Sequence, residues 1–359
     1  MKRSRAVSSW ATEDLADHCA APIHSTRRHV ESGKPAAGRP DGRGPYQIAM
    51  QRLYLRTAEQ TVLTGCDRFT DHRWWRSSGV RYDVGMVTVE EHYRLVAGYR
   101  THFIAAGEGR PVLLVHGVGG SMLTYQHNIE ELAAVARVYA LDLPGHGLSE
   151  LPDADYSAEN GGSYLCSFIE EVCGEPAALV GISAGGLMCA HAAVERPDLV
   201  TRLMLVSSAG FGRDIGWTLR LLTLPLVDRF VEEFTLKQVR GALEHQVYDP
   251  TQITPEFVQA VYQHWSRPGN RRTFLIALRR NISVFGLRRL RHHLRRTKVL
   301  AVPVMIVWGR NDRLIPVKHA YRAVKWIAGA QLRILERCGH MAPYEHPKEF
   351  NKIVREFLT

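Results

Sequence analysis

The chain has 359 residues, of which 45% are hydrophobic and 23% charged, as in ordinary soluble globular proteins. No apolar run approaches the roughly 18 to 20 residues of a membrane span, and the basic start lacks the apolar segment of a secretory signal. The six cysteines form no CxxC pairs, which indicates reduced thiols and neither a disulfide framework nor a zinc site. We therefore expect a cytoplasmic protein with no metal and no cofactor.

The net charge of +10 is unevenly distributed along the chain. Residues 267–298 hold ten arginines and one lysine without an acidic residue. Leu287, Leu290 and Leu294 recur there at helical spacing, which is typical of a helix with a solvated face. A second interpretation is contact with an anionic membrane surface, which would make the protein membrane-associated. That contact would use five arginines, namely Arg288, Arg289, Arg291, Arg295 and Arg296. No nucleic-acid-binding motif accompanies the charge, so we expect no nucleic-acid partner.

The first part of the chain differs in composition from the rest. Residues 1–45 are rich in Arg, Ser, Gly, Pro and His without apolar periodicity, which predicts a disordered N-terminal extension and makes Met50 a candidate alternative start. The segment 46–86 is predicted to form a helix, within IAMQRLYLRTAEQTVL, followed by a linker.

From residue 87 onward, apolar strand-like segments alternate with amphipathic helical segments. The strand-like segments are continuous apolar runs, as expected for strands buried on both faces of a sheet. They are PVLLVHG (111–117), VYALDLPG (138–145), AALVGIS (177–183), RLMLVSSAG (202–210), VPVMIVWG (302–309) and QLRILERCG (331–339). This alternation predicts an α/β fold with a mostly parallel central sheet flanked by helices. The predicted core comprises 87–212 and 299–359. Residues 213–298 show helix-like segments broken by prolines, which predicts an inserted helical cap.

The stretch GISAGG follows one of these apolar runs and precedes the helix-like GLMCAHAAVE. Its first five residues fit G-x-S-x-G, the pattern of a strained turn that exposes a serine hydroxyl between a strand and a helix. Glycines surround such a serine because side chains there would collide with the crossing strand and helix. We therefore predict that Ser183 is a nucleophile.

A serine hydroxyl needs a base to remove its proton, and the base needs an orienting acid. Asp312 follows VPVMIVWG and His340 follows QLRILE, so both lie past the carboxyl ends of predicted parallel strands, as Ser183 does. Asp214 is an alternative acid. His116 and His146 also lie near strand ends, but both precede Ser183, and we interpret them as structural or site-lining.

Acyl transfer also needs donors for the oxyanion that develops on the attacked carbonyl. The turn HGVGGS (116–121) follows a predicted strand, so its backbone amides are well placed. We expect the amides of Val118 and Ala184 to form the oxyanion hole.

Five segments in this order resemble the signature motifs of the α/β-hydrolase superfamily: HGVGGS, DLPGHGLS, GISAGG, WGRNDRLIP and CGHMAPYEHP. The resemblance covers roughly residues 87 to 359 and implies a capped serine hydrolase. Such enzymes include esterases, lipases and carbon–carbon bond hydrolases that act on aromatic ring-cleavage products. The last group usually has asparagine before the serine and tryptophan after the histidine, where this chain has Ile182 and Met341.

We therefore expect cleavage of a carboxylic ester with an apolar moiety. Carbon–carbon bond hydrolysis and acyl transfer are the alternatives within enzymes, and a ligand-binding protein without turnover is the alternative outside them. An apolar stripe at 217–234 either lines a substrate pocket or packs the cap against the core. The expected substrate-binding residues are Gly117, Trp217, Trp265 and Met341.

Overall fold

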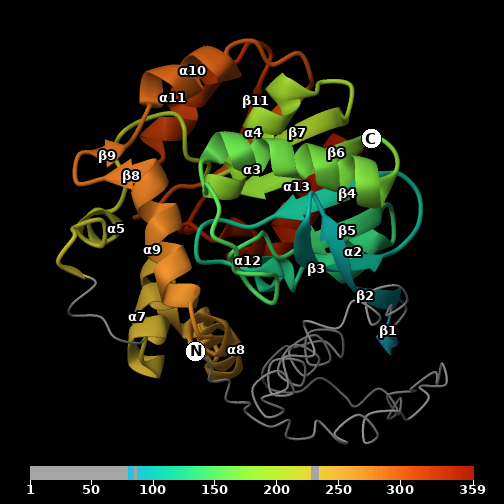
Figure 1. Ribbon diagram of the computed structural model, residues 1–359. Helices are drawn as coiled ribbons and strands as arrows, with labels where there is room; N and C mark the ends of the chain where they lie inside the picture. The colour runs from blue at the N-terminus through green and yellow to red at the C-terminus, as the bar shows by residue number, and fades with distance from the viewer. Residues whose placement is uncertain (1–79, 85–86, 228–233) are drawn as a thin grey trace, which may run out of the picture.

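The computed structural model describes residues 80–84, 87–227 and 234–359, and for 80–84 it describes the backbone alone (Figure 1). The predicted disordered extension (1–45), the helix predicted within 46–64 and part of the 217–234 stripe lie outside these residues. The strands of one nine-stranded sheet, in spatial order, are β1 (Val80–Val84), β2 (Val87–Val96), β3 (Tyr99–Ala106), β5 (Arg137–Leu141), β4 (Pro111–Val115), β6 (Ala177–Ile182), β7 (Val200–Val206), β10 (Val304–Gly309) and β11 (Gln331–Leu335).

The sheet is parallel from β5 to β11 and antiparallel at its β1 end. Every residue of β4, β6 and β10 is buried, as their continuous apolar sequences predict for strands covered on both faces. All six predicted strand segments are confirmed. Strand β1 pairs with β2, so the sheet begins before residue 87, within the segment predicted as a linker.

Helices flank this sheet, which confirms the predicted fold class. The helical elements are η2 (Met122–Tyr125), α2 (Ile129–Ala133), α3 (Ala158–Phe168), η3 (Ile169–Cys173), α4 (Ala184–Glu195), α5 (Trp217–Leu221), α7 (Leu236–Gln246), η4 (Pro250–Gln252), α8 (Pro255–Trp265), α9 (Asn270–Asn281), α10 (Leu290–Thr297), α11 (Lys318–Trp326), α12 (Ala342–Glu345) and α13 (Pro347–Leu358). Helix α13 illustrates why these segments form helices that cover the sheet. Its apolar residues Phe350, Ile353, Val354 and Phe357 recur at helical spacing and are all buried.

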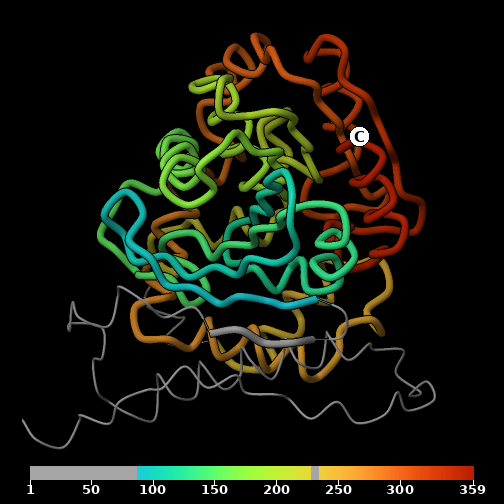
Figure 2. The backbone as a smooth tube through the Cα atoms, turned by 90° about the vertical axis from the view of Figure 1, so that its right-hand side faces the viewer, coloured from blue at the N-terminus to red at the C-terminus, as the bar shows by residue number. Residues whose placement is uncertain are grey.

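The segment between β7 and β10 is mainly helical. Figure 1 shows α5, α7, α8 and α9 gathered on one side of the sheet, and the turned view in Figure 2 shows α7 to α9 as a separate layer. A pair of two-residue strands, β8 (Ile282–Ser283) and β9 (Gly286–Leu287), interrupts the helices, although the sequence predicts no strand there. The assignment of 213–298 as a cap stays a prediction. Among the described residues, no helix is long and apolar enough to cross a membrane.

Candidate active site

Ser183 occupies a strained turn between β6 and α4. Its φ of 58° and ψ of −122° are rare for a residue with a side chain, and its amide donates to the carbonyl of Val206 at 2.9 Å. A Cβ on Gly185 would lie 2.3 Å from the carbonyl oxygen of His116, and one on Gly181 would lie 2.6 Å from that of Gly185. Glycine is therefore required at both positions because the strand and the helix approach too closely for a side chain.

Asp312 and His340 form a hydrogen-bonded pair in the loops that follow β10 and β11. Asp312 Oδ2 lies 2.8 Å from His340 Nδ1, while Oδ1 accepts from the amides of Leu314 and Ile315 at 2.8 Å each. Both residues are buried. The carboxylate is thus fixed by three donors, and it leaves Nε2 as the ring nitrogen available for a second partner.

The carboxyl ends of β6, β10 and β11 meet at one edge of the sheet, so Ser183, Asp312 and His340 share that edge. Within the described residues, no hydrogen bond joins the Ser183 hydroxyl to His340. A catalytic contact between Ser183 and His340 is therefore a proposal. Asp214, the alternative acid, instead pairs with Lys318 at 3.0 Å.

The amides predicted for the oxyanion hole lie beside the serine. Ala184 is the first residue of α4, where an amide has no acceptor within its own helix. The Val118 amide likewise has no acceptor among the described residues. Val118 and Ala184 both line the same cavity as Ser183. A Cβ on Gly117 would lie 2.8 Å from Ser183 Cβ, so the 116–121 turn passes directly over the serine.

The cavity at Ser183 has a volume of about 140 Å³ and a mostly apolar wall. Its large apolar lining residues come from the core and from the helical segment alike. They are Val118, Leu143, Pro144, Leu187, Met188, Ile215, Leu219, Leu278, Ile282, Leu287, Leu314 and Ile315. The polar ones are Tyr99, His146, Asp155, Tyr156, Ser157, Asn160, Tyr164, Ser183 and Asn281. Ser183 therefore lies at an apolar binding space, whereas Asp312 and His340 do not line this cavity.

The alpha/beta hydrolase family model matches residues 112–353. The chain belongs to the α/β-hydrolase family. An uncharacterized protein of Mycobacterium tuberculosis is 32% identical over 285 residues, covering 77% of this chain and 82% of that protein. The 2-hydroxymuconate semialdehyde hydrolase of Pseudomonas putida is 30% identical over 279 residues, covering 74% of this chain and 92% of the relative.

Solved structures agree with this assignment. A meta-cleavage product hydrolase from Pseudomonas fluorescens superposes with a TM-score of 0.64 at 27% identity, covering 74% of this chain and 96% of that structure. The chain therefore has the α/β-hydrolase fold and is an enzyme of this family.

Several residues expected to bind substrate in this α/β-hydrolase lie elsewhere. Trp217 is 65% exposed and does not line the cavity, because its helix α5 turns Leu219 inward instead. Trp265 stacks on Phe274 and donates to the carbonyl of Gly119 at 2.8 Å, so its hydrogen bond holds the 116–121 turn. Met341 is buried beside His340 and is also absent from the cavity wall, as is Gly117.

Glu345 holds the His340 loop and was not predicted from the sequence. Its buried carboxylate accepts from the amides of Gly339, Met341 and Tyr248, at 2.7 to 3.1 Å. Burial raises the pKa of Glu345, although these three donors oppose that effect. The sequence signal that points to Glu345 is its place in the motif CGHMAPYEHP, which also contains His340.

Of the two histidines interpreted as structural or site-lining, His116 is structural and His146 lines the cavity. His116 has Nδ1 at 2.7 Å from the carbonyl of Gly117, and its Nε2 accepts from the amide of Leu143 at 3.0 Å. It therefore fixes the turn that carries Val118. His146 lines the cavity, and burial lowers its pKa to about 3, so its ring is neutral.

A buried charge network supports the same loops. Asp142 accepts from His102 Nδ1 and from the amides of Met122 and Leu148, each at 2.8 Å, and His102 Nε2 lies 3.0 Å from Glu91. Burial alone would lower the pKa of His102, but its hydrogen bonds with Asp142 and Glu91 raise it to about 9. The imidazolium is thus part of the folded structure at neutral pH.

Because of this network, we expect the folded protein to lose stability in mild alkali. Because the pKa of His102 is higher in the folded chain, its contribution is complete below its unfolded pKa of about 6.5 and disappears as pH rises through about 9. We expect the free energy of unfolding to fall by about 3 kcal/mol across that window. Urea unfolding at several pH values measures this decrease in the free energy of unfolding. His102→Gln should flatten the decline, and an equal decline in that variant would contradict the assignment.

Proposed function

We propose that this enzyme hydrolyses a carbon–carbon bond next to a carbonyl group, in a product of aromatic ring cleavage. The observation that carries the proposal is the elbow serine at an apolar cavity, on the sheet edge that bears the Asp312–His340 pair. Two relatives support the substrate class: the 2-hydroxymuconate semialdehyde hydrolase of Pseudomonas putida and a 2-hydroxy-6-oxo-6-phenylhexa-2,4-dienoate hydrolase of Comamonas testosteroni.

In the first half-reaction, Ser183 Oγ attacks the substrate carbonyl while His340 Nε2 takes the hydroxyl proton. The negative charge that develops on the carbonyl oxygen is stabilised by the amides of Val118 and Ala184. The carbon–carbon bond then breaks, its electron pair leaves with the conjugated fragment, and that fragment receives the proton from His340. Asp312 keeps Nδ1 protonated and stabilises the imidazolium.

In the second half-reaction, water replaces the lost fragment. His340 takes a proton from water, the resulting hydroxide equivalent attacks the acyl-serine, and the same amides stabilise the second oxyanion. Collapse of this intermediate releases the carboxylic acid and returns the proton to Ser183. The same groups would cleave an ester, with an alcohol as the leaving group.

Ester cleavage is the second candidate, and a specific observation favours it. The substrates named for several relatives are dienoates or dienedioates and carry carboxylates. Among the described residues, neither arginine nor lysine lines the cavity at Ser183, and the carboxylate of Asp155, which does line it, is paired with Arg280. This apolar wall suits a neutral ester, and Ile182 and Met341, which replace the asparagine and tryptophan usual in carbon–carbon hydrolases, favour the same interpretation.

One pair of assays distinguishes carbon–carbon bond hydrolysis from ester hydrolysis. A coloured vinylogous diketone, with and without a terminal carboxylate, is compared with p-nitrophenyl esters from two to sixteen carbons. The main proposal predicts loss of diketone colour with a higher kcat/KM than for any ester, and Ser183→Ala abolishes it. A higher kcat/KM for an ester, with no diketone cleavage, would overturn the main proposal in favour of the second.

Membrane contact through the basic segment also stays a proposal. Arg288, Arg289, Arg291 and Arg295 are exposed, whereas Arg296 is half-buried. We expect co-sedimentation with phosphatidylglycerol vesicles that weakens with salt and is lost when Arg288, Arg291 and Arg295 become glutamine.

The matched control removes three positive charges elsewhere, from exposed Arg94, Arg333 and Lys348. Equal effects of the two triple variants would indicate a response to net charge alone. Vesicle binding unaffected by the first triple variant would mean that the basic segment is a solvated helix face.

A further inference from the structure

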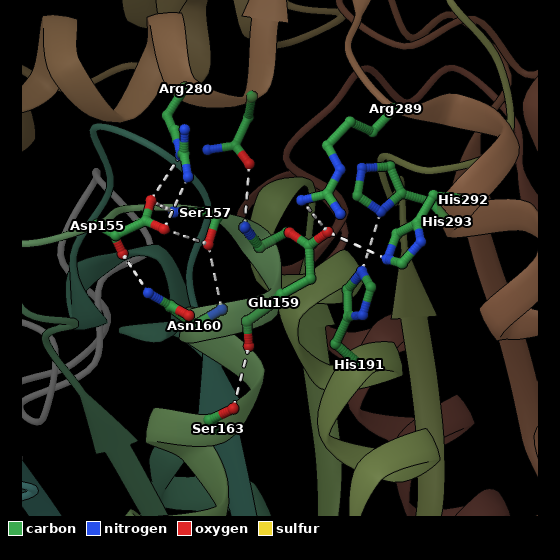
Figure 3. A network of polar contacts seen from close by, with 12 residues as sticks. Asp155, Ser157, Glu159, Asn160, Ser163, His191, Arg280, Arg289, His292 and His293 are labelled. Carbon is green, nitrogen blue, oxygen red and sulfur yellow. Dashed lines mark hydrogen bonds and ion pairs between the residues drawn. The ribbon is translucent and has the colours of Figure 1, made fainter.

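Three helices bring one carboxylate and two imidazoles together, away from Ser183. Glu159 lies in the first turn of α3, His191 lies on α4 and His293 lies on α10. One ligand-type atom from each of these residues lies within 4.8 Å of the others. Figure 3 shows His191 and His293 pointing toward each other, with Glu159 beside them. Sequence spacing gives no sign of this cluster, because its members are far apart along the chain.

One distance within the cluster is close to the ligand separation of a zinc site. His191 Nε2 and His293 Nδ1 are 3.0 Å apart and hydrogen-bonded to each other, so a metal would replace that bond. A tetrahedral Zn²⁺ with bonds of about 2.0 to 2.1 Å places its ligand atoms about 3.3 Å from one another. Both histidines are almost fully buried, and His191 Nδ1 has no hydrogen-bond partner within the described residues.

We propose that Glu159, His191 and His293 form a binding site for a divalent transition metal of the Zn²⁺ type. Two imidazoles and a carboxylate are a donor set that Zn²⁺ uses, with a fourth position left for water. Glu159 and His293 also line a second cavity of about 400 Å³, which has room for that water, although Arg279, Arg280, Arg288 and Arg289 line it as well. The metal would join α10 to α3 and α4.

Positive charges around the cluster oppose the cation and make the proposal testable. Arg289 Nη1 pairs with Glu159 Oε1 at 2.7 Å, and His292 Nε2 lies 3.2 Å from the same oxygen. The Arg289 side chain is 54% exposed and can swing into solvent, so the metal would displace it from Glu159. Removing Arg289 should therefore strengthen metal binding.

The experiment measures Zn²⁺ binding to the full chain by calorimetry after chelator treatment, with Co²⁺ absorption reporting tetrahedral geometry. We expect one Zn²⁺ per chain at this site and, at free Zn²⁺ about 100 times Kd, a rise in Tm of roughly 5 °C. His293→Asn and Glu159→Gln should each weaken binding, His293→Asn by about 100-fold or more, since even outer partners of ligands contribute 10- to 100-fold. Arg289→Asn, which tolerates the φ of 51° at that position, should bind more tightly.

His245→Asn, on α7, is the control and should leave the affinity unchanged. Zn²⁺ held by other residues of the chain would be insensitive to His293→Asn, and that result would overturn the proposal. An unchanged or weaker affinity in Arg289→Asn, with the protein folded by circular dichroism, would overturn it as well. Absence of stoichiometric binding by the wild type would do the same.

Discussion

Replacing Ser183 by alanine is expected to lower kcat by about 10⁵-fold, because the acyl-enzyme can no longer form. The residual rate would come from substrate binding and from the oxyanion amides of Val118 and Ala184, which the substitution leaves in place. Alanine keeps the Cβ that the φ of 58° has to accommodate, so Tm should stay within about 2 °C of wild type. Steady-state kinetics on the best substrate, with a melting curve, measure both quantities.

A matched control is Ser163→Ala, which removes an exposed hydroxyl on α3 that hydrogen-bonds Glu195. It should leave kcat within about two-fold of wild type, since surface changes of this kind have small effects. Substantial activity in Ser183→Ala would assign the nucleophile to another residue, even if the fold is intact.

Asp142→Ala is expected to produce the largest loss of stability. The carboxylate is fully buried, and its removal leaves His102 charged in the interior and the amides of Met122 and Leu148 without their acceptor. Removing one partner of a buried ion pair costs about 3 to 5 kcal/mol, so we expect a loss of about 4 kcal/mol in the free energy of unfolding. Denaturant titration measures it as a lower midpoint.

The control for this substitution is Asp153→Ala, which removes an exposed carboxylate from the same region of the chain. It should change stability by less than about 0.5 kcal/mol. The pH dependence supplies a second check. Burial opposes ionisation of Asp142, but the hydrogen bond from His102 lowers its pKa, so its contribution is present at neutral pH and lost as pH falls below about 4. A small effect of Asp142→Ala at pH 7 would contradict the role given to this network.

The core fold could be predicted because its signals are local. Continuous apolar runs identify strands buried on both faces, as in β4 and β6, and the glycines around Ser183 identify the turn between β6 and α4. The pairing of Asp312 with His340 was also foreseeable, since both residues follow strands whose carboxyl ends share one edge of the sheet. Chain order and strand direction are enough for these inferences.

The cavity wall could not be predicted in the same way, because helix rotation decides which side chains face inward. Trp217 and Leu219 are two residues apart on α5, yet the leucine lines the cavity and the tryptophan is exposed. Glu345 accepts from the nearby amides of Gly339 and Met341 and also from that of Tyr248, and the contact with Tyr248 leaves no pattern in the sequence because it is far away along the chain. The cluster of His191 and His293 depends likewise on how α10 packs against α4.

The most direct test of the central claim, that Ser183 is a nucleophile activated by His340 and Asp312, is covalent labelling with an organophosphonate followed by peptide mass spectrometry. We predict one label per chain, on Ser183, formed about 10⁴-fold more slowly in Asp312→Asn because His340 then adopts the wrong tautomer. A label on another residue, or an equal rate in Asp312→Asn, would contradict the proposed catalytic arrangement.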